Sequence, residues 1–431
     1  MSTAADDVPL ALAARLNEAC ECVWVDREKL RGRLRADLGA EAAALEGREG
    51  LVSGHVVFLG AKEAAAMDRA IALITHALGS DAFEAHVRET APAIAATPPA
   101  ASAGVLGFDF HLGGPVPQLI EINTNPGGLL VNLELAQAAT ACCDCLGAPL
   151  PALASAGLDL DALGARLVAS FRGDWIRARG AKPLRTVAIV DDAPEAQYLY
   201  PEFLLYRGLF ERAGWRARIA DPAALATTAD ALLLDGEPVD LVYNRLTDFY
   251  LDEPRHAALR SAYEHDLAVV TPHPAAHARW ADKRRLAWLR DERLLRAAGL
   301  DDDERAAVLA AVPPTEIVAP EHAGTLWARR KTLFFKPGDG FAGKAAYRGE
   351  KLTRGTFERL LGERYVAQAL APTSFRRVSA PDGAVAEMRV DIRNFAVAGR
   401  TWLRAARLYR GQTTNFRTAG GGFAPVLSLP G

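Results

Sequence analysis

The chain has 431 residues, of which 50% are hydrophobic and 24% charged, and this length allows two or three domains that each bury a core. The formal net charge of −3 argues against nucleic acid or an anionic membrane as a partner, so small molecules or proteins are expected instead. The acidic N-terminus does not resemble a secretion signal, and five cysteines are too few for a disulfide framework. We therefore expect a cytoplasmic, reduced protein.

Helices and short strands alternate in the first 150 residues. The spacing of Leu and Ala predicts a helix over residues 8–46 and a second, amphipathic helix over 64–78. Two strands, 104–109 and 118–122, are expected to pair through a Gly-Gly-Pro turn. The apolar stretch 129–146 that follows contains Asn, Glu and Asp, and is therefore not a membrane span.

Strands and helices alternate again between residues 186 and 275, which predicts a parallel α/β unit. Its expected strands are residues 187–190, 216–219, 241–243 and 268–270. A third region begins near residue 274 with a highly charged helix, expected over 281–298. Farther on, residues 387–397 and 402–408 are predicted to be antiparallel neighbours.

Three polar side chains on the first pair of strands are the most informative in the chain. Asp109 closes one strand, while Glu121 and Asn123 leave the same face of the next. If the strands pair, two carboxylates and an amide oxygen meet, and these hard oxygen ligands suit Mg²⁺ held partly through substrate phosphates. The alternative is a solvated strand face. Against it, the flanking residues are apolar, and the Asn-Pro-Gly-Gly turn at 125–128 offers backbone N–H groups to an anion.

A glycine-rich loop follows the apolar strand Leu-Phe-Phe. Gly338, Gly340 and Gly343 allow backbone amides to close over a polyphosphate, and Lys336 supplies a charge for it. The same loop fits the first positions of a Walker A motif, but Ala345 stands where that motif needs Ser or Thr. A hairpin flap between two strands is therefore the preferred interpretation, ahead of a hairpin that binds no ligand.

Other polar residues carry weaker signals. Lys283, at the start of the charged helix, either reaches a phosphate or lies on a solvated helix face, and spacing alone does not decide between them. His273 and His277 are expected to belong to a helix-capping region around Pro274 rather than to a metal pair. Candidates for a substrate pocket at the end of a strand, with ordinary loop polarity as the alternative, are Tyr243, Asn244 and Arg245.

The five cysteines form two close groups, Cys20 with Cys22, and Cys142 with Cys143 and Cys145. Their spacing is not the two-residue gap usual between metal ligands, and the second group lies in an Ala/Leu-rich helical pattern. Buried structural thiols are therefore expected rather than a metal site.

Together these segments resemble the ATP-grasp superfamily over most of residues 104–132 and 186–426. The segment from Arg407 to the Gly-Gly-Gly turn resembles the glutathione synthetase branch. The residues that the resemblance assigns to the nucleotide are Lys283, Lys336, Gly338, Gly340, Gly343, Tyr365, Val366 and Gln368. Those that it assigns to the metal are Asp109, Glu121 and Asn123.

The order of the segments departs from the family, because the strand with Glu121 normally comes last and here comes first. The simplest explanation is circular permutation, as in families that include glutathionylspermidine synthetase-like proteins. Permutation predicts that Gly431 lies near the N-terminal region and that Glu121 packs beside the strand containing Arg407. The arginine usual just before the first metal acid is missing, because position 107 is Gly. The catalytic candidates are Arg393, Arg407 and Arg417, with Asn415 in the same C-terminal segment.

The fold class implied by the resemblance combines α/β and α+β parts: a multidomain, circularly permuted ATP-grasp fold with an α/β domain similar to the pre-ATP-grasp domain. Residues 1–150 would be the permuted segment with the metal-binding strand, and 151–183 a helical linker. Residues 184–275 would form the α/β substrate domain, and 276–431 the nucleotide-binding lobes.

The activity implied by the resemblance is ATP-dependent ligation of a small carboxylate, such as an amino acid or peptide, to an amine. It would use ATP and two Mg²⁺ ions, pass through an acylphosphate, and release ADP and phosphate. A small-molecule kinase with the same site is the first alternative. A nucleotide-binding regulatory protein without turnover is the second, and the complete metal trio argues against it.

Overall fold

The computed structural model describes residues 12–45, 47–96, 99, 101–142, 146, 149–154, 159–340, 345–379, 385–412, 414–416 and 418–429. Within these residues the largest sheet has seven strands in the order β2-β20-β19-β18-β3-β4, with β17 paired to β18. They are β2 (Val57–Leu59), β3 (Leu106–His111), β4 (Gln118–Asn123), β17 (Ser374–Ser379), β18 (Val385–Val397), β19 (Arg400–Tyr409) and β20 (Gly422–Ser428). Their pairings are antiparallel except that of β2 with β20.

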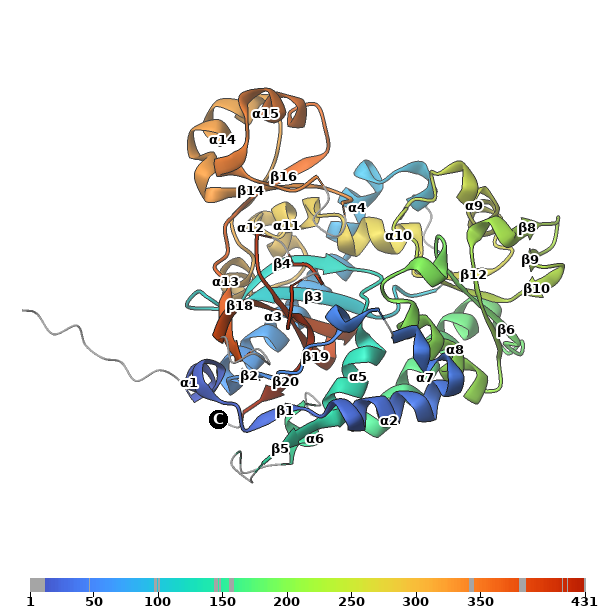
Figure 1. Ribbon diagram of the computed structural model, residues 1–431. Helices are drawn as coiled ribbons and strands as arrows, with labels where there is room; N and C mark the ends of the chain where they lie inside the picture. Colours follow the sequence, from blue (N-terminus) through green and yellow to red (C-terminus); the bar gives the residue numbers. More distant parts are fainter. Residues whose placement is uncertain are drawn as a thin grey trace, which may run out of the picture.

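Segments from both ends of the chain meet in this sheet. β20 lies between β19 and the N-terminal strand β2 (Figure 1). Leu429, the last described residue, donates its N–H to Leu59 O at 2.8 Å, so the end of the described chain lies beside the N-terminal region. Gly431 itself is outside the described residues. The expectation that Glu121 packs beside the strand of Arg407 is wrong, because the hairpin attaches to β18 through β3, and both strands lie between β4 and β19.

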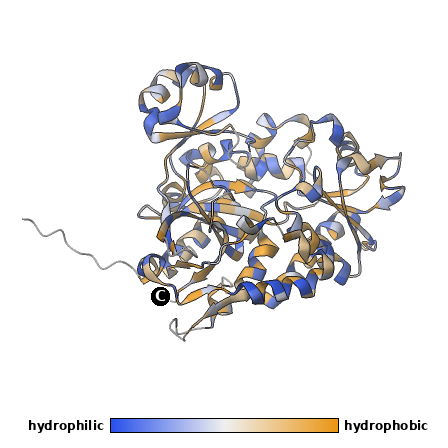
Figure 2. Ribbon diagram, viewed as in Figure 1, coloured by the Kyte–Doolittle hydropathy of each residue, from blue (hydrophilic) through white to orange (hydrophobic). Residues whose placement is uncertain are grey.

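Helices cover both faces of the sheet. On one face, α3 (Ala61–Gly79) buries the predicted stripe of Met67, Ile71, Ile74 and Leu78, each 0% exposed. On the other face, α5 (Leu129–Ala138) packs against β19 and β20 and is buried almost all round. Figure 2 shows α5 in orange and the outer helix α2 largely in blue. No helix in the described part of the chain has both the length and the apolar character that crossing a bilayer requires.

The helix predicted over residues 8–46 is interrupted. The structure has α1 (Leu12–Ala19) and α2 (Arg27–Leu38), with β1 (Val23–Val25) between them and paired to β5 (Ala139–Ala141). Asp26 caps the start of α2. The Leu and Ala spacing does not reveal this break, because β1 is stabilised by a partner far along the chain. The remaining helices of this part are α4 (Asp81–Thr90) and α6 (Leu150–Ala154).

A separate four-stranded sheet has the order β12-β11-β6-β7 and is parallel throughout, which confirms the predicted α/β unit. Its strands are β6 (Thr186–Val190), β7 (Arg216–Ala220), β11 (Leu241–Asn244) and β12 (Val269–Thr271). Nearby elements are α7 (Leu160–Arg179), α8 (Tyr200–Arg212), α9 (Ala257–Glu264) and the small sheet of β8 (Leu225–Thr227), β9 (Leu232–Leu234) and β10 (Glu237–Val239). The chain adds β7 on one side of β6 and later β11 on the other, so a topological switch point lies between β6 and β11.

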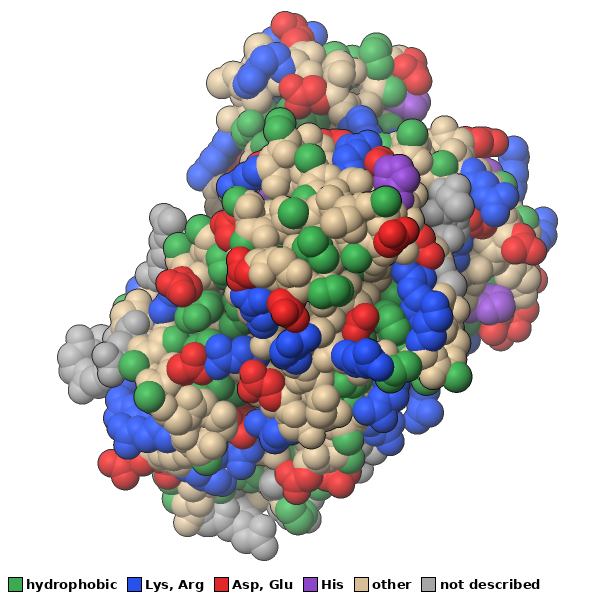
Figure 3. Space-filling model, turned by 90° about the vertical axis from the view of Figure 1, so that its right-hand side faces the viewer, with side chains coloured by type: hydrophobic (Ala, Val, Ile, Leu, Met, Phe, Trp, Pro, Cys, Tyr) green, Lys and Arg blue, Asp and Glu red, His purple; other side chains and the backbone are tan. Residues whose placement is uncertain are grey.

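A smaller lobe stands above the rest of the molecule in Figure 1. It contains the antiparallel sheet β13-β16-β14-β15 and has its own core, which includes Phe335 and Phe357. Its elements are β13 (Thr315–Ile317), α14 (Ala323–Arg329), β14 (Leu333–Pro337), β15 (Tyr347–Arg348), α15 (Arg354–Leu360) and β16 (Tyr365–Ala369). Figure 3 shows the lobe at the top of the molecule, with acidic and basic side chains interspersed over the face below it.

Short helices lead into this lobe where one charged helix was predicted over residues 281–298. They are α10 (Pro274–Ala276), the π-helical turn His277–Ala281, α11 (Arg284–Trp288), α12 (Glu292–Ala297) and α13 (Asp302–Ala311). Two aspartates make the breaks. Asp282 accepts the N–H of Arg284 at 3.0 Å, and Asp291 caps α12 through its side chain.

Candidate active site

The strands β3 and β4 pair and bring the three predicted metal ligands together. Asp109 lies opposite Glu121, and Asn123 is two residues farther along β4. The side-chain amide of Asn123 donates to Asp109 Oδ2 at 3.2 Å and to Glu121 Oε1 at 3.3 Å. A solvated strand face does not describe this arrangement, because Asp109 is fully buried.

Two arginines from the long strands hold Asp109. Arg393 on β18 donates Nε to Oδ1 at 2.7 Å and Nη2 to Oδ2 at 2.6 Å, and Arg407 on β19 donates Nη2 to Oδ2 at 2.7 Å. Burial would raise the pKa of Asp109, but the two guanidinium groups outweigh it and hold that pKa well below its usual range. The carboxylate is therefore ionised, and two of the predicted arginines lie directly beside the trio.

A second buried acid, Asp391 on β18, extends this network. Arg407 donates Nε to Asp391 Oδ1 at 2.6 Å, and the hydroxyl of Thr414 donates to Oδ2 at 2.5 Å. Burial opposes the charge of Arg407, but the carboxylates of Asp109 and Asp391 raise its pKa overall. Asp391 was not among the site residues predicted from the sequence. In the sequence, Asp391 and Arg393 share a strand face, but the same strand also carries Glu387, Arg389 and Asn394, so this pattern alone does not single out Asp391.

Arg393 occupies the space beside the glycine at position 107. A Cβ atom placed on Gly107 would lie 3.5 Å from Arg393 Nε and 2.6 Å from Pro126 Cβ. Position 107 therefore has no space for a side chain. Arg393 contacts Asp109 from the neighbouring strand instead.

The remaining catalytic candidates are placed differently. Asn415 donates to Arg410 O at 2.9 Å and accepts the hydroxyl of Thr418 at 3.1 Å, so its amide engages its own loop. Arg417 is outside the described residues. The catalytic roles of all these residues stay predictions.

Two lysines face the metal trio, one at the start of the flap and one before α11, although both come from the other half of the chain. Lys336, near the end of β14, donates Nζ to Ile120 O on β4 at 2.9 Å. Lys283 Nζ lies 3.9 Å from Glu121 Oε2 and donates to Gly340 O at 2.6 Å. Lys283 is only 8% exposed, which excludes a solvated helix face. The acidic strand and the glycine flap therefore border one space.

The glycine loop connects two antiparallel strands, and in the part of the chain that the structure describes a strand follows it, not a Walker A helix. β14 pairs with β15 directly after the loop. Gly338 is held on both sides, because its N–H donates to Arg364 O at 2.7 Å and its carbonyl accepts the N–H of Lys283 at 2.8 Å. A Cβ atom on Gly340 would overlap the ring of the proline three residues earlier. Gly343 is outside the described residues.

The strand predicted to bind adenine, β16, is an inner strand of the small sheet. Val366 and Gln368 pair with both β13 and β14. Gln368 Oε1 accepts Lys336 Nζ at 2.8 Å, and the Tyr365 hydroxyl donates to Ala345 O at 2.8 Å. These side chains therefore position Lys336 and the flap, and their contact with a nucleotide stays a prediction.

The donors of the trio fit a Mg²⁺ ion. Glu121 and Asn123 are half-buried and offer oxygens, whereas both oxygens of Asp109 already accept arginine N–H groups. The amide N–H₂ of Asn123 stands between two carboxylates, an arrangement of negative charge that also attracts a cation. Glu121 and Asn123 would hold the ion, with Asp109 shared between it and the arginines.

His273 and His277 do not form a metal pair. His273 Nδ1 accepts the N–H of Ala276 at 3.1 Å, which confirms the predicted cap. His277 stacks on Phe249 with 3.8 Å between ring centres, and burial lowers its pKa to about 3.

The described cysteines are less uniform than predicted. Cys20 is buried, Cys22 is half-buried and Cys142 is exposed. Pairing of β1 with β5 brings the two groups together, because Cys142 N donates to Cys22 O at 2.9 Å. Buried thiols are thus confirmed for Cys20 alone; Cys143 and Cys145 are outside the described residues.

No family model and no curated protein matches the sequence. Among solved structures, a glutathione synthetase-like effector from Globodera pallida, in its apo form, matches 92% of this chain and 97% of its own, with a TM-score of 0.52 and 12% identity. The two chains share a fold. At this identity the likeness shows the fold alone.

Two further structures match less well. A structure named for gamma-glutamylcysteine synthetase, from Methylobacillus flagellatus, matches 82% of this chain and 86% of its own, with a TM-score of 0.47 and 12% identity. The ATP-grasp ligase PsnB, complexed with a minimal precursor, Mg and ADP, matches 56% of this chain and 88% of its own, with a TM-score of 0.28 and 18% identity.

Proposed function

We propose that the chain is an ATP-dependent carboxylate–amine ligase that forms an amide or peptide bond and releases ADP and phosphate. The observation that supports this most directly is the contact of Lys336 and Lys283 with the strand that carries Glu121 and Asn123. Cations suited to a polyphosphate and oxygens suited to a metal then border one space. The fold shared with a glutathione synthetase-like protein agrees with this proposal.

The proposed reaction activates the acid as an acylphosphate, which the amine then attacks. Mg²⁺ held by the trio would neutralise the polyphosphate and polarise the transferred phosphoryl group. Lys336 and Lys283 would bind phosphate oxygens as point charges. Arg407 donates Nε to Asp391 and Nη2 to Asp109, and its remaining guanidinium nitrogen would stabilise the oxyanion that forms at the acyl carbon. Arg393, fixed on both oxygens of Asp109, would orient that acid.

The proposed division of the chain follows the sheets. Residues 276–431 would bind the nucleotide and 184–275 part of the substrate, with 151–183 as a helical linker. Residues 1–150 would supply the metal strand as a permuted segment. The position of β3 and β4 at the end of a sheet built mostly from C-terminal strands supports this permutation. A second Mg²⁺ ion and a cytoplasmic location stay predictions.

The test is ADP release by the purified protein with ATP, Mg²⁺ and a panel of amino acids and amines. We expect release to depend on the amine and to fall by at least about a hundredfold in Glu121→Ala, because a metal ligand is lost. Glu321→Ala, at an exposed position in the small lobe, is the control and should keep wild-type turnover.

Each outcome has a separate meaning. ADP release without an amine, together with a stable phosphorylated product, would identify a small-molecule kinase instead. Near-normal turnover of folded Glu121→Ala would remove the metal site from the proposal.

A further inference from the structure

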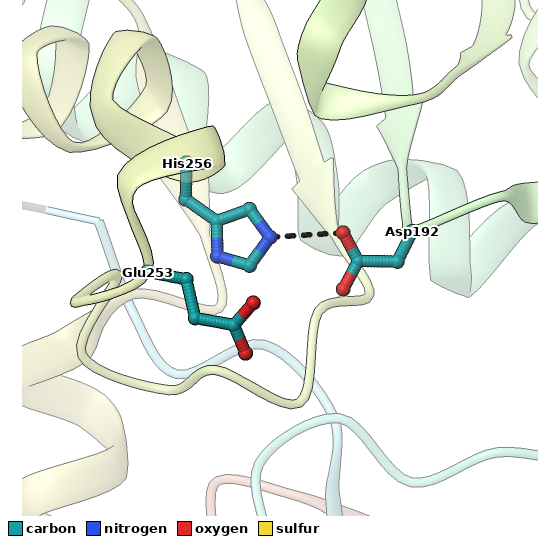
Figure 4. A group of neighbouring side chains, drawn as sticks. All are labelled: Asp192, Glu253 and His256. Carbon is teal, nitrogen blue, oxygen red and sulfur yellow. Dashed lines mark hydrogen bonds and ion pairs between the residues drawn. The ribbon is translucent and has the colours of Figure 1, made fainter.

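A cluster of acids around a buried histidine lies outside the candidate active site. In Figure 4, ligand atoms of Asp192, Glu253 and His256 are within 4.8 Å of one another. The cluster is not a second metal site, because His256 uses one ring nitrogen on Asp192 at 2.9 Å and the other on Asp248 at 2.7 Å. Although burial opposes it, these carboxylates raise the pKa of His256, so both nitrogens carry protons and offer a metal no lone pair.

A pair of thiols at the other end of the molecule is better placed for chemistry. The sulfur atoms of Cys20 and Cys22 lie 3.1 Å apart, where the chain passes from α1 to β1 (Figure 1). A disulfide bond places two sulfurs about 2.0 Å apart, so these two need to approach by only about 1 Å. Residues 20–22 lie outside both elements, and Cys22 is at a bend, which suits the tight ring that such a bond closes.

The two thiols differ in their access to solvent. Cys20 is buried, whereas Cys22 is half-buried and can be reached by a small oxidant. When a pair of thiols is oxidised, an accessible sulfur is attacked first and a neighbouring thiol then resolves the product into a disulfide. Cys22 therefore has the position of the attacked cysteine, and Cys20 that of the resolving one.

A buried guanidinium group lies against the same segment. Arg376 on β17 is 1% exposed, and within the described residues its hydrogen bonds all go to carbonyl oxygens, among them Cys20 O at 2.5 Å and Val56 O at 2.9 Å. Burial lowers the pKa of Arg376, whereas the charges available at Cys20 and Glu21 oppose this. A cation beside a thiol is typical of cysteines that react with oxidants, because the thiolate is the reactive form.

We propose that Cys20 and Cys22 form a disulfide bond reversibly when the protein meets hydrogen peroxide. The Cys22 thiolate attacks one peroxide oxygen and the O–O bond breaks, which gives a sulfenic acid on Cys22 and, after proton uptake, one water. Cys20 then attacks the Cys22 sulfur, the S–O bond breaks and a second water leaves. The two thiols lose two electrons and two protons in total, and the peroxide takes up both. This modification site does not depend on the proposed ligase reaction.

The bond is expected to be readily reduced rather than a permanent cross-link. Only one residue separates the two cysteines, and a short loop gains least from the chain-entropy effect of a disulfide. Disulfides that are strained or exposed are also the ones that thiols reduce most easily. The pair therefore suits a site that responds to the surrounding oxidant.

The test is a tryptic digest of the folded protein after brief exposure to hydrogen peroxide and alkylation of the remaining thiols in denaturant. Cleavage after Arg15 and Arg27 releases residues 16–27, which contain both cysteines of the pair, whereas the other three cysteines fall in the peptide 89–166. We expect peptide 16–27 without alkyl groups and lighter by two hydrogen atoms than its reduced form. Treatment with dithiothreitol should restore both alkylation sites.

Each other result of the digest contradicts the proposal. A cross-link between peptides 16–27 and 89–166 would give Cys22 a partner in the second cysteine group instead. Peptide 16–27 recovered fully alkylated would show that the pair does not react, and recovery as a sulfinic or sulfonic acid would show that Cys20 does not resolve the first product.

Variants and a peptide separate the role of each thiol from that of the fold. In Cys20→Ser the sulfenic acid on Cys22 should persist and be trapped by dimedone, whereas the control Cys142→Ser should form the bond as wild type does. The synthetic peptide 16–27 has both thiols but lacks Arg376, so the folded protein should form the bond at least about tenfold faster. Equal rates would show that closeness in sequence alone explains the bond, and would overturn the assignment of a site built by the fold.

Discussion

Lys336 Nζ lies 2.9 Å from the carbonyl oxygen of Ile120, although the two residues are 216 positions apart in the chain. This contact joins the small lobe to the strand that carries the metal trio. Because Glu121 follows Ile120 directly, any ligand held by the acidic strand lies close to the amine of Lys336. The amine is half-buried and less basic than a free lysine, so its charge depends on pH.

We expect ATP binding to weaken as the pH rises through about 8. Burial, together with the charge of Lys283, lowers the pKa of Lys336 to about 8 despite the opposing carboxylate of Glu121. The ammonium form, which attracts phosphate, is therefore present below that pH and lost above it. The measurement is the Kd of ATP with Mg²⁺ on either side of pH 8.

Substitution of single lysine residues identifies the group whose titration weakens ATP binding. In Lys336→Gln the Kd should rise about ten- to hundredfold and lose this pH dependence, because a charge-assisted contact is removed. Lys351→Gln, exposed in the small lobe, should follow the wild-type profile. A pH profile that survives in Lys336→Gln would assign the titration to another group.

The parts of the site predictable from sequence are those set by local geometry. Glu121 and Asn123 share a face because side chains alternate along a strand, and a short turn suffices to bring Asp109 opposite them. The hairpin after Lys336 was predictable for the same reason, since its glycines and the strand before it are neighbours in sequence.

The parts that could not be predicted depend on partners far along the chain. Asp391 is recognisable as a site residue only once β18 and β19 pair and place Arg407 opposite it. The strand order was mispredicted because nothing in the sequence states that β3, rather than β4, attaches to β18.

Asp109→Asn is expected to destabilise the fold by about 3–5 kcal/mol, because two buried guanidinium groups lose their shared countercharge. The measurement is the free energy of unfolding from urea denaturation at neutral pH. Asp230→Asn, at an exposed position, should change it little.

The pH dependence of the free energy of unfolding provides the control for the loss of the Asp109 charge. The two arginines hold the pKa of Asp109 below its ordinary value of 3.8. The contribution of the ionised carboxylate to the free energy of unfolding is therefore present above pH 3.8, and it is lost as the pH falls through the lower, folded-state pKa. The stabilities of wild type and Asp109→Asn should therefore converge on acidification. A difference that stays constant with pH would show that packing, not charge, explains the loss.

Gly107→Ala should destabilise the fold by about 1–3 kcal/mol, because its Cβ would lie 2.6 Å from Pro126 Cβ and force the turn or β3 to shift. The same Cβ would lie 3.5 Å from Arg393 Nε, so the shift should also disturb the hydrogen bonds from Arg393 to Asp109. We therefore expect the rate of ADP release to fall even at temperatures where the variant is fully folded. The matched control is Gly32→Ala within α2, where a Cβ meets nothing within 4 Å and should stabilise the helix by about 1 kcal/mol. If Gly107→Ala matched wild type in both urea stability and turnover, Arg393 would not be filling the place of the arginine missing at position 107.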